Sequence, residues 1–221
     1  MAIVIFELHL LTLKKMDSLL WQPNDSGPIY KETFAGHWPI IEPFNTASNL
    51  VFLAIVIYWS FKVFKNVRQQ QFLAFATPVL FIGFVGGTLY HGTRSHEVWL
   101  LMDWLPIAIL TMAVSIHFQV KNKYPIWLVL LISTFPFLVG FLVYAQLNIP
   151  DKWASAIGYS NMGLVILGPI IHHLYKQNWR DAKWVWIALL LFAFAITFRT
   201  VENTSIDVLP MGTHFLWHTF G

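Results

Sequence analysis

Long apolar stretches constrain the fold of this chain more than any other feature. Six of them are each close to the roughly 20 residues that a helix needs to cross a bilayer. They are Phe44–Val63, Phe72–His91, Glu97–Phe118, Tyr124–Leu147, Ala154–Tyr175 and Lys183–Phe198. Only 11% of all residues are charged, whereas a soluble domain has about a quarter. The surplus apolar surface requires lipid, and the sequence therefore predicts an integral membrane protein.

A seventh apolar stretch begins near Val208 and runs to Gly221. It is too short for a full crossing, so the last helix is either short or incomplete in the sequence as given. The predicted fold is an all-α, seven-helix transmembrane bundle over residues 44–221, preceded by an extramembrane segment over residues 1–43. Within that segment, residues 1–15 are interpreted as dispensable, with Met16 as the true start. The alternative is an amphipathic helix lying on the outer leaflet.

Basic residues predict the orientation of the bundle. The loops after the first, third and fifth stretches are the more basic ones, which places them in the cytoplasm by the positive-inside rule. The N-terminus then faces the non-cytoplasmic side, although Lys14 and Lys15 weakly disagree. No basic stripe suited to nucleic acid is present. There is no cysteine, which excludes disulfides and cysteine-ligated metals.

Ionisable residues at membrane depth usually have a role, and four of them are candidates here. They are His91, Asp103, His214 and His218. His214 and His218 share one helix face because they are four residues apart. The predicted topology brings all four to the non-cytoplasmic side at similar depth. Three histidines plus water form the open coordination of a catalytic zinc, with Asp103 available to orient or deprotonate the water. Alternatively, Asp103 only pairs with a histidine to satisfy both groups.

Thr88 lies one turn before His91 and shares its helix face. It is a candidate hydrogen-bond donor to the attacking water or to an oxyanion. The alternative is that Thr88 bonds only to its own helix backbone. Gly86 and Gly87 are expected to permit close helix packing. The remaining histidines within the apolar stretches, His117, His172 and His173, are predicted to be interfacial.

The ordered set of motifs resembles the alkaline ceramidases and the wider CREST membrane hydrolases, which include adiponectin-receptor-like proteins. The matching blocks are Glu42-x-x-Asn45-Thr46-x-Ser48-Asn49-Leu50, Gly87-Thr88-x-Tyr90-His91, Asp103-x-Leu105-Pro106 and His214-x-x-Trp217-His218. The resemblance implies zinc held by His91, His214 and His218, and water handled by Asp103. It also implies cleavage of a ceramide-like lipid amide, entering from the bilayer, to a sphingoid base and a fatty acid. The alternatives are a receptor or sensor with a structural zinc, and a metal-free transporter with a proton relay.

The sequence departs from that family in three places. Gly87 stands where the family usually has a serine, so Thr88 is the substitute oxyanion donor. The family's cysteine pair is absent. Alkaline ceramidases also bind calcium before the first span, and Glu42 matches one calcium ligand. At the other ligand offsets stand Pro28, Ile29, Lys31 and Thr33.

Overall fold

The computed structural model describes residues 22–33, 40–146, 151–202, 204 and 209–221. Within these ranges the chain is helical, and the all-α prediction is confirmed. The helices are α2 (Pro43–Ser48), α3 (Leu50–Val63), α4 (Gln71–Thr93), α5 (Glu97–Lys121), α6 (Ile126–Gln146), α7 (Asp151–Lys176), α8 (Ala182–Glu202) and α9 (His214–Phe220), with a short 3₁₀ helix at Val67–Gln69. The hypothesis about residues 1–15 and Met16 concerns residues outside this range.

Helices α2 and α3 follow one another with only Asn49 between them, and together they form the first predicted span. Counted this way, the described residues contain seven α-helical segments, as the sequence predicts. Five are long and apolar enough to cross a membrane by length and composition, and they support a multi-pass membrane protein. These five are Pro43–Val63, Gln71–Thr93, Glu97–Lys121, Ile126–Val143 and Ala182–Glu202.

The last two segments differ from the sequence-based expectation. Helix α8 continues to Glu202 instead of stopping at Phe198. Arg199, which directly follows the predicted stretch Lys183–Phe198, therefore lies inside a helix of the bundle. Helix α9 begins only at His214 and has 7 residues. Both predicted metal ligands of this segment still fall on α9, at its first and fifth positions.

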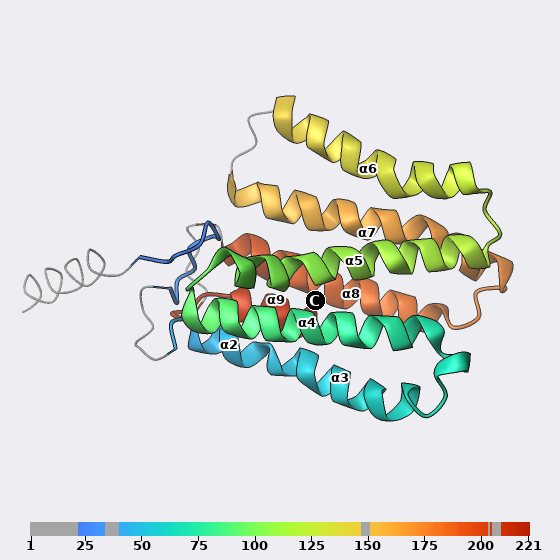
Figure 1. The fold of residues 1–221 in the computed structure, drawn as a ribbon. Coiled ribbons are helices and arrows are strands. Elements are labelled where there is room, and N and C mark those ends of the chain that lie inside the picture. The colour runs from blue at the N-terminus through green and yellow to red at the C-terminus, as the bar shows by residue number, and fades with distance from the viewer. Residues whose placement is uncertain (1–21, 34–39, 147–150, 203, 205–208) are drawn as a thin grey trace, which may run out of the picture.

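The long helices run side by side, and α6 lies at the outside of the bundle against α7 (Figure 1). The short α9 packs against α8 and α2. Helices α4 and α5 approach closely at Gly86, where an added Cβ would lie 2.3 Å from Met102 Cβ. Glycine is required at this contact because any side chain would push the two helices apart.

The distribution of side chains suits a lipid environment. Large apolar residues cover the outside, including Phe61, Ile126, Phe141 and Leu164. Many of the fully buried side chains are instead polar or charged. A soluble protein with this apolar exterior would associate or aggregate. Lipid removes that penalty, and buried polar groups then connect the helices through hydrogen bonds.

The described part of the N-terminal segment is tied to the end of α4. The backbone N–H of Asn24 donates to Arg94 O at 2.9 Å, and the N–H of Ile41 donates to Gly92 O at 3.0 Å. The N–H of Glu42 donates to His91 O at 3.1 Å. These bonds place the residues that precede α2 directly beside His91. The domain boundary between residues 43 and 44 stays a prediction.

Candidate metal centre and adjoining cavity

Three buried histidines converge at one end of the bundle. His91 comes from the last turns of α4, and His214 and His218 come from α9. One nitrogen of each ring lies within 4.8 Å of those of the other two rings. The three residues are 0%, 2% and 4% exposed, respectively. The structure thus brings together the three residues that the sequence proposes as metal ligands, and their donor set suits zinc.

Glu42 determines which nitrogen of His91 is available. Its Oε2 lies 2.5 Å from His91 Nδ1. An ionised carboxylate only accepts hydrogen bonds, so Nδ1 carries the hydrogen and Nε2 keeps a lone pair. Nε2 is buried and has no hydrogen-bond partner among the described residues. A carboxylate behind a histidine is the usual arrangement around a metal-binding imidazole.

Ser48 plays the same part for His218. The Ser48 hydroxyl has one hydrogen, which it donates to Asn45 O at 2.7 Å. Its oxygen, 2.8 Å from His218 Nδ1, must therefore accept a hydrogen from that nitrogen. His218 Nε2 is left with its lone pair. Two of the three rings are thus held in the tautomer that binds a metal through Nε2.

His214 is held differently. Its ring stacks on Tyr30, with centroids 3.9 Å apart and planes 22° apart. Arg199 Nη1 lies 2.9 Å from its Nδ1 and 3.5 Å from its Nε2. A guanidinium only donates, so the His214 ring accepts from Arg199. A metal bound to His214 would have to share or replace this contact, which makes Arg199 part of the candidate centre.

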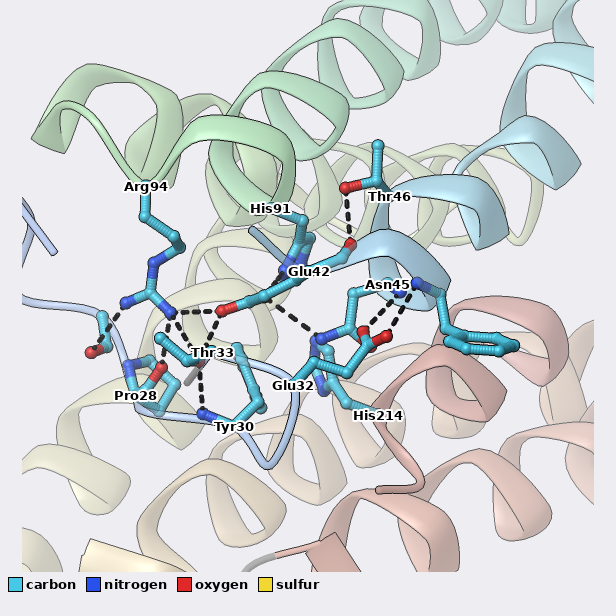
Figure 2. A network of polar contacts seen from close by, with 12 residues as sticks. Pro28, Tyr30, Glu32, Thr33, Glu42, Asn45, Thr46, His91, Arg94 and His214 are labelled. Carbon is cyan, nitrogen blue, oxygen red and sulfur yellow. Dashed lines mark hydrogen bonds and ion pairs between the residues drawn. The ribbon is translucent and has the colours of Figure 1, made fainter. Parts of the chain in front are cut away.

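Four donors hold the Glu42 carboxylate, and both of its oxygens accept hydrogen bonds. Figure 2 shows this network. Its Oε1 accepts from Thr33 Oγ1 and from Arg94 Nη1, both at 2.6 Å. Its Oε2 accepts from His91 and from Asn45 Nδ2, the latter at 3.1 Å. Burial opposes ionisation, but the hydrogen bond from His91 and the charge of Arg94 hold the pKa of the Glu42 carboxyl below its usual range. Glu42 is therefore ionised at neutral pH.

The end of α8 determines where α9 begins. The Glu202 carboxylate accepts the backbone N–H of Thr213, and it accepts the N–H of Lys31 at 3.1 Å. The preceding residue, Gly212, has φ +83°, and an added Cβ there would lie 2.4 Å from Glu202 Oε2. Glycine fits because it tolerates positive φ and leaves room for the carboxylate. This contact orients the short helix that carries His214 and His218.

Asp103, the predicted proton acceptor, lines a cavity of about 230 Å³ together with His218, Arg199 and Tyr159. A Cβ added at Gly87 would lie 2.5 Å from Asp103 Oδ1 and 2.6 Å from Asn49 Oδ1. The missing side chain at Gly87 thus makes room for two polar groups. A serine at this position, as in the resembling family, would displace at least one of them.

Thr88 has a buried hydroxyl, and Thr88 Oγ1 has no hydrogen-bond partner among the residues the structure describes. The alternative that it bonds to its own helix backbone is therefore not seen. Thr88 is not among the side chains that line the cavity around Asp103. Its role as an oxyanion donor stays a prediction.

A second, apolar cavity of about 380 Å³ adjoins the first. It extends between α5, α7 and α8 and is lined mainly by aliphatic side chains such as Val114, Ile166 and Leu189. Both cavities share six lining residues, which are Phe52, Leu80, Ile107, Leu110, Tyr159 and Trp217. An apolar chain can therefore lie in the larger cavity while a polar group reaches Asp103 and His218.

The sequence pattern missed several residues of this centre. Arg199 could have been found from the sequence, because it directly follows a long apolar stretch. A charged residue at membrane depth usually has a functional role. From the sequence, Glu42 is only part of a family motif and a match to one calcium ligand. Its pairing with His91, 49 positions away, has no local signature. The same holds for the pairing of Ser48 with His218.

Most of these residues lie in a region that matches a known protein family. The model of the Ceramidase family matches residues 32–209, most of the chain. The match includes Glu42, His91, Asp103 and Arg199, and it ends before α9. No curated protein matches the chain. The extent of the family match over these residues shows that the chain belongs to the Ceramidase family.

Proposed function

We propose that the protein is a zinc-dependent intramembrane amidase that hydrolyses ceramide-like lipid amides to a sphingoid base and a fatty acid. The observation that carries this proposal is the convergence of three buried histidines, two of them held with Nε2 available. His91, His214 and His218 would hold the ion. Zinc, when bound, polarises a carbonyl and lowers the pKa of water.

The remaining chemistry belongs to Asp103 and Thr88. Asp103 takes a proton from the attacking water and returns it to the leaving amine. Its position in the cavity beside His218 supports this assignment. Thr88 donates a hydrogen bond to the developing oxyanion, a role supported by its buried, unpartnered hydroxyl. Glu42 and Ser48 keep His91 and His218 in the required tautomers.

The two adjoining cavities support a lipid substrate. The apolar cavity accepts a hydrocarbon chain, and the polar one accepts the amide. The substrate enters laterally from the bilayer. The basic residues in the loops support an orientation with the N-terminus and the metal centre on the non-cytoplasmic side. A cysteine-substitution accessibility assay at Lys121 and at Ser95 tests this orientation.

The decisive experiment combines metal analysis with lipid mass spectrometry on purified protein. We expect about one zinc per chain and release of equal amounts of sphingoid base and fatty acid from ceramide. His91→Ala is the control and should release neither. Zinc without turnover would favour the receptor or sensor interpretation. Absence of stoichiometric metal would contradict both and favour the transporter.

A further inference from the structure

Among the fully buried residues that the structure describes, Arg94 has the largest side chain, and it is only 1% exposed. It directly follows α4, three positions after His91, and its backbone adopts the left-handed conformation with φ 46°. This conformation is costly for a residue with a Cβ and persists only where surrounding contacts impose it. The Arg94 backbone N–H donates to Tyr90 O at 2.8 Å and ends the helix there.

The Arg94 guanidinium is surrounded by oxygen atoms from the N-terminal segment and from Glu42. Nε and Nη2 bind the two oxygens of Asp25 at 3.0 Å and 2.7 Å. Nη1 binds Glu42 Oε1 at 2.6 Å and Pro28 O at 3.1 Å. The longest contacts are to Gly27 O at 3.3 Å and to Thr33 Oγ1 at 3.4 Å. Two carboxylates, two carbonyls and a hydroxyl are also the donor set of a calcium site.

We propose that Arg94 is a built-in cation that takes the place of a divalent ion beside the metal centre. It neutralises Asp25 and Glu42 together, and it fixes Glu42 so that Oε2 points at His91. Arg94 is thus a positioning residue that acts on His91 through Glu42. The effect on zinc rests on the proposed function, whereas the replacement of a divalent cation rests only on the contacts of Arg94.

The electrostatics explain why this position needs a cation. Without Arg94, two buried carboxylates would lack a counter-charge, and each would then gain by turning toward water. A Glu42 side chain that rotates away no longer accepts the hydrogen of His91 Nδ1. Loss of such an outer partner typically lowers metal affinity by about 10–100-fold.

The proposal predicts a gain of calcium dependence in Arg94→Ala. In a calcium chelator, the variant should bind zinc about 10–100-fold more weakly than the wild type. Its thermal unfolding temperature should also fall. Millimolar calcium should raise that temperature and recover zinc affinity, because the vacated oxygens can hold the ion. The wild type should respond to neither calcium nor chelator. The matched control is Arg180→Ala, whose side chain is 81% exposed and should leave both readouts unchanged.

Removing Asp25 from the variant tests whether the same oxygens bind calcium. Arg94→Ala with Asp25→Asn should lose the calcium response, because the bidentate carboxylate is gone. Two results would overturn the proposal. One is that Arg94→Ala in chelator binds zinc as tightly as the wild type and is equally stable. The other is that calcium restores neither the zinc affinity nor the unfolding temperature of Arg94→Ala. If Arg94→Ala does not fold, Arg94→Lys carries the test. Its single ammonium cannot reach Asp25 and Glu42 with the same geometry, so unchanged zinc affinity would contradict the positioning role.

The outcome also separates this inference from the proposed function. If the wild type holds no zinc, the amidase proposal fails, and with it the effect of Arg94 on zinc affinity. Calcium-dependent thermal stabilisation of Arg94→Ala would still show that the guanidinium replaces a divalent cation. If the wild type holds zinc and hydrolyses lipid but Arg94→Ala ignores calcium, only the inference about Arg94 fails.

Discussion

The two ends of the bundle differ in how they use histidine. The end that holds α9 has His91, His214 and His218, and the opposite end has His117, His172 and His173. The first three are buried, whereas the second three are partly exposed. In the part of the chain that the structure describes, only the first three converge closely enough to share an ion.

The hydrogen-bond partners account for much of the difference. At the opposite end, His172 Nδ1 lies 2.5 Å from the Tyr124 hydroxyl. His173 Nδ1 lies 3.2 Å from Asn122 Oδ1. These neutral partners connect α7 to the end of α5, and Asn122 Nδ2 also donates to Pro169 O at 2.7 Å. A high density of histidine therefore does not make a metal centre. Convergence of the rings and an ionised acceptor such as Glu42 do.

Removing the histidines should produce the largest contrast between the two ends. His91→Ala, His214→Ala and His218→Ala should each deplete zinc and abolish lipid turnover, because a three-ligand site cannot retain the ion with two. His172→Ala and His173→Ala should keep about one zinc per chain. Metal analysis of purified variants measures this. Full metal retention in all three variants of the first set would contradict the proposed centre.

At the end of the bundle that holds α9, Asp103→Asn separates proton transfer from metal binding. The amide preserves size and removes the base, so zinc should stay bound while the rate falls by about 10²–10⁴. Ceramide turnover and zinc content are measured on the same sample. Turnover near the wild-type rate would reassign Asp103 to a structural role.

Thr88→Val tests the oxyanion donor. The valine has nearly the same shape and lacks the hydroxyl, so turnover should fall by about 10²–10³ if Thr88 donates to the oxyanion. Thr134→Val is the control, since Thr134 donates to Leu130 O within its own helix and is exposed. An equally small effect in both variants would show that the Thr88 hydroxyl has no part in catalysis.

The smallest expected effect compares the hydroxyls that hold a histidine at each end. Ser48→Ala removes the acceptor for His218 Nδ1 and should weaken zinc binding by about tenfold. Tyr124→Phe removes the hydroxyl beside His172 Nδ1 and should leave zinc affinity unchanged. Competition with a chelator measures both affinities. Equal affinities in the two variants would show that Ser48 does not prepare His218 for the metal.

The sequence alone determined the helical architecture and the metal-ligand candidates. Apolar runs of bilayer length predict helices because lipid requires every backbone group to be hydrogen-bonded within its own segment. The i, i+4 spacing of His214 and His218 places both on one face of any helix. The alternation of helix direction brings His91 to the same end. These conclusions depend on local geometry and chain order, which a sequence contains.

Only the tertiary structure decided how each histidine is held. Glu42 binds His91, Ser48 binds His218, and Arg199 reaches His214 through contacts that depend on the rotation and depth of separate helices. Hydrophobic periodicity does not reveal that rotation here, because most residues of these helices are apolar and the polar residues are too widely spaced to mark one face. For the same reason the sequence did not predict that Arg94 binds Asp25 and Glu42. It also did not predict that Asp103 and Asn49 fill the space beside Gly87. Packing between distant segments determines these contacts, and no local pattern encodes it.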